Sequence, residues 1–167
     1  MRFITVLAAS LAIIGAVSGQ QTAPSTAKNC PMMQRADETM GFAAAKTTHH
    51  FRLLENGGVI EVAANDPKDA DSRDEIRMHL THIAGMFSEG DFDAPMFIHD
   101  TTPPGVPTMI KLRSEIRYRY EEMAAGGRVL ISTQNPQALD AIHAFLLFQI
   151  VEHRTGDGGS IEHRSSD

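Results

Sequence analysis

Two stretches of this chain share one layout, and that layout constrains the fold more than any other feature. They read HHFRLLENGGVIEVAANDP (49–67) and IRYRYEEMAAGGRVLISTQNP (116–136). In both, apolar and polar side chains alternate around a Gly-Gly pair, and a proline follows the second glycine after the same nine-residue interval. Alternation with period two indicates strands, and glycines between two such runs indicate a turn. We therefore predict two β-hairpins that form an internal repeat.

Each hairpin is followed by a helical pattern. Ser72 and Glu75 have the spacing of a capping box at the start of the first helix, and Asn135-Pro136 is typical of the start of the second. Apolar residues then recur at helical spacing: Ile76, Leu80, Ile83 and Phe87 in the first helix, and Leu139, Ile142, Leu146 and Ile150 in the second. These patterns predict an α+β fold of two ββα repeats, with a four-stranded antiparallel sheet and two helices on one of its faces.

The pattern also predicts how the chain is divided. A single α+β domain is expected over 47–156, with repeat units at 47–90 and 114–156 and a Pro-rich connection at 91–113 between them. Residues 1–19 carry one positive charge and an apolar run ending in small residues, which is typical of a secretory signal peptide. A flexible segment over 20–46 and a disordered tail over 157–167 complete the expected organisation. The protein is then expected to be periplasmic or secreted, with no stable membrane span.

Composition narrows the class of partner. The 167 residues hold 15 Lys and Arg against 21 Asp and Glu, for a net charge of −6, and no cluster of basic residues appears. A nucleic-acid binder needs such a cluster, so this class is excluded.

The chain is rich in side chains that bind soft metals: it has 8 His, 9 Met and one Cys but no Trp. Imidazole, thioether and thiolate are the ligands of soft or borderline transition metals, and thioether favours Cu(I).

The first predicted helix places three such side chains on one stripe. His79, His82 and Met86 stand at positions i, i+3 and i+7, at the border of the apolar face. Met96 and His99, on the Pro-rich connection, could close a site over this stripe, and His49 faces the helices from its strand while His50 faces away. The alternative for each of these residues is an ordinary packing or solvated role. The spacing of His79 and His82 lacks the H-E-x-x-H pattern of zinc proteases.

The N-terminal segment adds further soft ligands. It reads Cys30-Pro31-Met32-Met33, followed by Met40. The CPM triplet resembles the start of the short heavy-metal-binding motif of bacterial copper and silver export systems, with Met33 where that motif has His. More widely, the blocks KTTHHF, GGVIEV, RDEIR, GDF, HDTTPPGVPTM and AIHAFLLFQIVEHRTGD resemble a group of small exported bacterial proteins without a characterised activity. That resemblance implies a discrete family and brings no catalytic residues with it.

The sequence thus predicts a metal-binding protein, with copper the expected ion and a role as chaperone, buffer or resistance accessory. The expected ligands are His79, His82, Met86, Met96, His99, Cys30, Met32 and His49. An exporter or a copper protein is the partner such a carrier would serve. Non-covalent haem with axial His and Met is a second possible cofactor.

Three other histidines receive different interpretations. His143 lies inside the apolar stripe of the second helix and is expected to be a hydrogen-bonded core residue. His153 falls in the last helical turn, where a cation complements the helix dipole, and His163 lies in the tail. Phe145 and Phe148 lie off the main stripe of the same helix, so a homodimer contact or the packed connection is expected to cover them.

Two other functional classes stay open. One is a binding module that recognises a small molecule or a protein through the open face of the sheet. That face would carry a mixed set of charged side chains: His50, Arg52, Glu61, Arg117, Arg119 and Arg128. The other is an enzyme that uses His99 or His79 as a general base, an idea supported only by the usual pKa of histidine.

Overall fold

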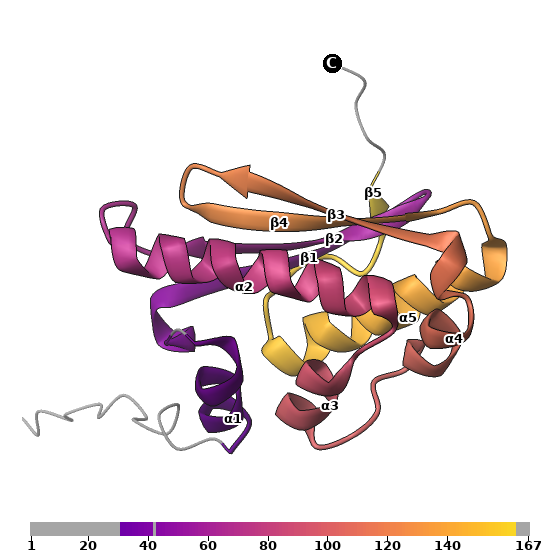
Figure 1. Cartoon of the computed structure of the whole chain (residues 1–167), viewed down its shortest axis with the longest axis horizontal. Coiled ribbons are helices and arrows are strands. Elements are labelled where there is room, and N and C mark those ends of the chain that lie inside the picture. The colour runs from indigo at the N-terminus through magenta and orange to yellow at the C-terminus, as the bar shows by residue number, and fades with distance from the viewer. Residues whose placement is uncertain (1–30, 42, 163–167) are drawn as a thin grey trace, which may run out of the picture.

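The computed structural model describes residues 31–41 and 43–162 of the chain (Figure 1). The elements are α1 (Pro31–Met40), a short 3-10 turn (Ala44–Lys46), β1 (Thr47–Leu54), β2 (Gly57–Ala64), α2 (Ala70–Glu89), α3 (Asp93–His99), α4 (Val106–Lys111), a second 3-10 turn (Arg113–Glu115), β3 (Ile116–Met123), β4 (Gly126–Thr133), α5 (Pro136–His153) and β5 (Ile161–Glu162). The expected signal peptide over 1–19 and Cys30 lie outside the described residues.

The sheet has the order β3-β4-β2-β1-β5. β1 and β2 form one antiparallel hairpin and β3 and β4 form the other, while β2 and β4 pair antiparallel at the centre. This central pairing explains why β2 and β4 each begin with glycine. A Cβ on Gly57 would lie 1.9 Å from the carbonyl oxygen of Ile131, and one on Gly126 would lie 2.1 Å from that of Val62. Only glycine lets the two hairpins approach this closely.

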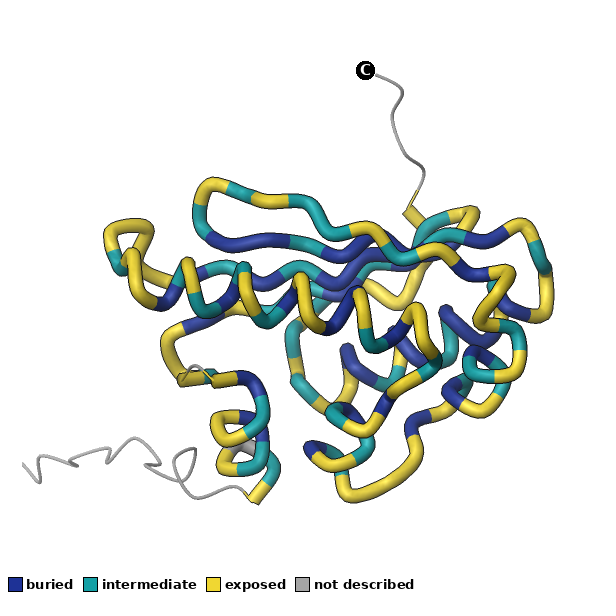
Figure 2. Tube along the Cα trace, in the orientation of Figure 1, coloured by how far each residue is buried: buried dark blue, intermediate teal, exposed yellow. Residues whose placement is uncertain are grey.

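α2 and α5 both cover one face of the sheet, and α1, α3 and α4 lie on the same side, farther from the strands (Figure 1). The buried residues line the layer between strands and helices, as Figure 2 shows. Three aromatic rings join the helices at its centre. Phe87 and Phe92 stack with ring centroids 4.3 Å apart, and Phe145 meets both rings edge-on at 6.0 Å. Phe145 is thus covered within the chain itself.

The prediction of a four-stranded antiparallel sheet with two helices is wrong. The class is α+β, but the sheet has five strands and is mixed, and the described residues form five α-helices. The fifth strand, β5, pairs in parallel with β1 through Leu53 and Leu54. It is only two residues long, so it has no alternating pattern that a sequence could reveal.

α1 and the following 3-10 turn occupy residues that the sequence suggested would be flexible. In α1, Ala36 and Met40 are buried against the rest of the core, and Arg35 donates a 2.9 Å hydrogen bond from Nε to the carbonyl oxygen of Ile98 in α3. Two buried side chains on a ten-residue helix leave too weak an apolar period for the pattern to stand out.

The Pro-rich connection forms two short helices, α3 and α4. Pro95 and Pro107 lie in their first turns, where a backbone N–H has no intrahelical partner to lose. These helices cover the side of α5 that faces away from the sheet, and Phe148 meets His99 of α3 edge-on at 5.0 Å. In the expected tail, residues up to 162 reach β1 through Asp157 and β5. Across the described part of the chain, no helix is long and apolar enough to span a bilayer.

Candidate functional site: a pocket of histidines

A small cavity of about 70 Å³ lies between the sheet and the helices. Most of its lining is apolar, from residues such as Ile60, Leu80 and Phe87. The polar side chains of the lining are four histidines and one amide: His49, His79, His99, His153 and Gln149. Met40 adds a thioether. We call this cavity the histidine pocket.

The four histidines come from four different elements. His49 faces the helices because it alternates with His50 along β1, and it shares its face with Phe51. His79 borders the buried stripe of α2, next to Leu80. His99 ends α3, and His153 ends α5. The fold therefore brings together side chains that are far apart in the sequence.

Three of the four imidazole rings lie close together, with His153 between the other two. The rings of His49 and His153 stack with centroids 5.6 Å apart and planes at 17°, and the ring of His99 meets that of His153 edge-on at 5.1 Å. Phe51 lies 5.6 Å from His153 and closes the apolar side of the cluster. His153 is thus the centre of the group.

Burial keeps these histidines neutral. It lowers the pKa of His49 to about 4, with a further contribution from His50, and it lowers the pKa of His79 to about 4, with further contributions from His49 and His82. The pKa of His153 is lowered to about 3 by burial and by the nearby His49 and His99. Burial also lowers the pKa of His99. Neutral imidazole is the form that coordinates metal ions, so the pocket holds its donors ready at neutral and mildly acidic pH.

Gln149 fixes the protonation pattern of one ring. Its Oε1 lies 3.1 Å from Nε2 of His99, and an amide oxygen can only accept a hydrogen bond. With the amide in this orientation, Nε2 of His99 carries the proton and Nδ1 carries the lone pair. That Nδ1 atom is buried and has no hydrogen-bond partner among the described residues. A buried imidazole nitrogen with a free lone pair is normally satisfied by a hydrogen-bond donor or by a metal ion.

A second, more open cavity of about 400 Å³ adjoins the pocket, and we call it the outer groove. Its lining comes from α1, α2 and α3: Thr39, His79, His82, Ile83, Met86, Asp93, Ala94 and Phe97. It contains the predicted stripe of His79, His82 and Met86. His82 is exposed and Met86 is half-buried. His79 lines both cavities.

Two of the other predicted ligands, Met96 and Met32, lie outside both cavities. Met96 lies on α3, and its sulfur accepts a 3.7 Å hydrogen bond from Oγ1 of Thr102. Met32 packs against the core from α1, and neither Met32 nor Met96 lines the pocket or the groove. Within residues 31–41 and 43–162, no three His, Cys, Asp or Glu side chains already stand in an arrangement that could hold a metal ion.

Sequence reasoning missed His153 by assigning it to the helix dipole. The signal was present, because fourteen residues after Leu139 the helical wheel returns to the apolar face of α5. His143 is held as the sequence predicted, with Nε2 at 2.9 Å from the carbonyl oxygen of Leu54 and 3.0 Å from that of Gly57. It takes no part in the pocket.

Haem does not fit the histidine pocket. Cavities that take ligands of ordinary drug size measure roughly 300–1,000 Å³, and a porphyrin needs at least that. The pocket measures about 70 Å³. It has room for an ion or a very small molecule.

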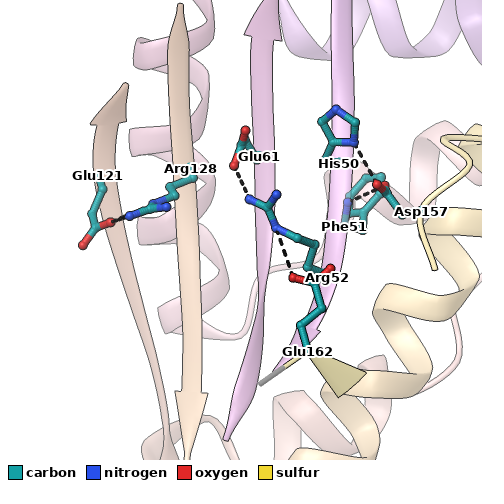
Figure 3. A network of polar contacts seen from close by, with 8 residues as sticks. All are labelled: His50, Phe51, Arg52, Glu61, Glu121, Arg128, Asp157 and Glu162. Atoms are coloured by element: carbon teal, nitrogen blue, oxygen red, sulfur yellow. Dashed lines mark hydrogen bonds and ion pairs between the residues drawn. The ribbon is translucent and has the colours of Figure 1, made fainter. Parts of the chain in front are cut away.

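The open face of the sheet pairs many of its own charges, as Figure 3 shows. Arg52 pairs with Glu61, Arg128 with Glu121, and His50 with Asp157. Arg119 also pairs with Glu121. A charged partner at this face would compete with these existing pairs, each of which is worth about 0–1 kcal/mol when exposed.

Comparisons of this chain with protein-family models, with curated proteins and with solved structures gave no match. The functional interpretation therefore relies on the residues of the chain and on the chemistry of their arrangement.

Proposed function

We propose that this protein binds a transition-metal ion, copper foremost, in the histidine pocket, and that it acts as a carrier, buffer or resistance accessory for that ion. The observation that carries the proposal is the convergence of four half-buried histidines, one of them with a buried, unpartnered Nδ1, on a cavity of ionic size. The signal-like residues 1–19 suggest that it works in the periplasm or outside the cell.

The donor set favours Cu(I) over Zn(II). The lining is mostly apolar, and among the described residues no carboxylate belongs to it, so the charge of a bound ion would be poorly solvated there. The desolvation penalty is smaller for a monovalent ion than for a divalent one. The thioether of Met40 is also a ligand that suits Cu(I). Binding requires the rings to turn about their side-chain torsions, since they now stack with one another. The ring centroids of His49 and His99 already lie 5.6 and 5.1 Å from that of His153, so a rotation of the side chains is the adjustment we expect.

The test is anaerobic competition for Cu(I) between the purified, untagged protein and a chromophoric chelator. The decisive variant is the double substitution His99→Phe and His153→Phe, which keeps two rings in the cluster and removes four ring nitrogens. We expect one tightly held ion in the natural protein and a loss of about a hundredfold or more in affinity in the variant. His50→Asn, which changes a histidine on the opposite face, is the matched control and should bind as before.

Thermal unfolding of each variant shows whether it still folds. Equal Cu(I) affinity in the folded double variant and the natural protein would rule out the pocket as the site. Recognition through the open face of the sheet has less support, because the charges there are largely paired.

A further inference from the structure

Two further cavities share lining residues with the histidine pocket, and they differ in chemistry. One is the outer groove, which meets the pocket at His79. The other is a cavity of about 260 Å³ between the 3-10 turn after α1 and the end of α5, which meets the pocket at Met40, His49 and His153. These two cavities are the candidate routes by which an ion would enter.

The groove side carries metal donors. His82 offers an exposed imidazole, Met86 a half-buried thioether, and Asp93 an exposed carboxylate. The opposite cavity presents threonine hydroxyls and the guanidinium of Arg154 around the shared residues. A cation is attracted by the carboxylate and repelled by the guanidinium. The ligands and the charge therefore favour arrival through the groove.

We propose that the outer groove is a loading site for Cu(I), in which His82 and Met86 capture the ion and His79 passes it to the histidine pocket. The inference rests on the proposed function of that pocket. His79 can serve both sites because it is the one histidine whose side chain lines both. The transfer is an exchange of ligands at constant oxidation state: a bond from copper to a groove donor breaks as a bond to a pocket imidazole forms.

A loading site has a kinetic signature. A transient binding site changes the rates of Cu(I) uptake and release by the same factor. The final affinity stays unchanged, because it depends only on the metal-free and the loaded protein. Loss of His82 and Met86 should therefore slow loading without weakening the loaded complex. Both side chains lie at the surface or close to it, so their replacement should leave the fold intact.

The experiment is stopped-flow transfer of Cu(I) from bicinchoninate to the protein without oxygen, followed by the loss of the chelate's colour. The variant His82→Asn/Met86→Leu should load at least about tenfold more slowly, with an equilibrium affinity within about twofold of the natural protein. Met78→Leu replaces an exposed methionine of the same helix outside the groove and is the matched control. It should load at the natural rate.

The remaining outcomes separate the two proposals. An unchanged loading rate in the groove variant overturns the loading site while the pocket stands. A matching loss of affinity also overturns it, because copper would then reside in the groove itself. No Cu(I) binding by the natural protein removes the proposed function and the loading site together, whatever the variants do.

Discussion

Gln149 and His99 form a buried pair in which Oε1 of the amide lies 3.1 Å from Nε2 of the imidazole. The remaining polar atoms of the pair, Nε2 of Gln149 and Nδ1 of His99, are buried and lack hydrogen-bond partners among the described residues. Unsatisfied buried polar groups cost free energy, typically about 1–3 kcal/mol each. A pair of this kind fits a site in which Gln149 orients a ligating imidazole and the binding of an ion offsets part of that cost.

Gln149 should therefore act as a positioning residue for Cu(I). In Gln149→Leu the acceptor is lost and His99 is free to adopt the other tautomer, so we expect Cu(I) affinity to fall by about 10–100-fold. Gln149→Glu keeps an oxygen acceptor opposite Nε2 and should restore most of the affinity. Chelator competition on the three proteins gives the result. Equal losses in the Leu and Glu variants would show that Gln149 matters through packing alone.

The stability of the metal-free protein should decrease in mild acid. The pKa values of His49 and His79 are lowered to about 4 and that of His153 to about 3 in the folded state, against 6.5 for an unperturbed histidine. As pH falls through 6.5, the unfolded chain takes up protons that the folded chain excludes, so the free energy of unfolding falls. The dependence from these groups fades about one pH unit above 6.5, where the unfolded chain no longer binds the extra protons.

The size of this effect can be measured by urea unfolding in the presence of a chelator. For His79 alone, linkage gives a loss of about 2 kcal/mol between pH 7 and pH 5. His79→Phe should reduce the difference in unfolding free energy between these pH values by about that amount. Met78→Leu, at an exposed position on the same helix, should keep the difference. A difference that is the same in all three proteins would contradict the burial of the cluster.

Two glycine-to-alanine substitutions should have opposite effects on stability. Gly105 has φ +85°, and a Cβ there would lie 2.0 Å from the carbonyl oxygen of Ala141, where α4 packs on α5. Gly105→Ala should therefore cost at least about 2 kcal/mol. Gly85 is an exposed residue within α2, and a Cβ there meets nothing within 4 Å. Gly85→Ala should stabilise the protein by about 0.5–1 kcal/mol, through higher helix propensity.

Urea denaturation of both variants at neutral pH measures these changes in free energy. The pair is informative because the chemical change is the same and only the surroundings differ. Tolerance of Gly105→Ala would contradict the close contact between α4 and α5, and destabilisation by Gly85→Ala would contradict the open surroundings of Gly85 in α2.

The strongly periodic parts of the fold could be predicted from the sequence. Both hairpins and both long helices follow patterns of period 2.0 or 3.6, and the N-cap at Asn135 is where the sequence placed it. The N-cap of α2 differs from the prediction. Asp69 caps α2 in place of Ser72, because its carboxylate accepts from both the backbone N–H and the hydroxyl of Ser72. A carboxylate is the better acceptor for helix N–H groups.

The candidate site could be predicted only in part. Alternation along β1 correctly placed His49 toward the helices, and the helical wheel placed His79 at the edge of the core. The convergence of His99 and His153 depends on how α3 folds back against the end of α5, and no local pattern encodes that contact. The short helix α3, which holds Met96, lies in the Pro-rich connection, where the prolines gave no reason to expect a regular element.

The last prediction concerns Asp157, which attaches the C-terminal segment to the edge of the sheet (Figure 3). Its Oδ2 accepts a 2.9 Å hydrogen bond from the backbone N–H of Phe51, and its Oδ1 lies 2.8 Å from Nδ1 of His50. Burial alone would raise the pKa of Asp157, but hydrogen bonds from Thr155, Phe51 and His50 lower it overall. The carboxylate is therefore ionised at neutral pH and occupies an edge of β1 that could otherwise pair with another strand.

Asp157→Ala should release this segment without unfolding the domain. We expect a loss of about 1–2 kcal/mol in unfolding free energy, and hydrogen exchange at the Phe51 amide faster by about tenfold. Asp140→Ala, an exposed aspartate on α5, is the control and should change neither quantity. Because β5 pairs with only Leu53 and Leu54, its own two backbone pairings cannot hold the segment once the carboxylate is gone. Unchanged exchange at Phe51 in Asp157→Ala would show that β5, and not Asp157, protects this edge of the sheet.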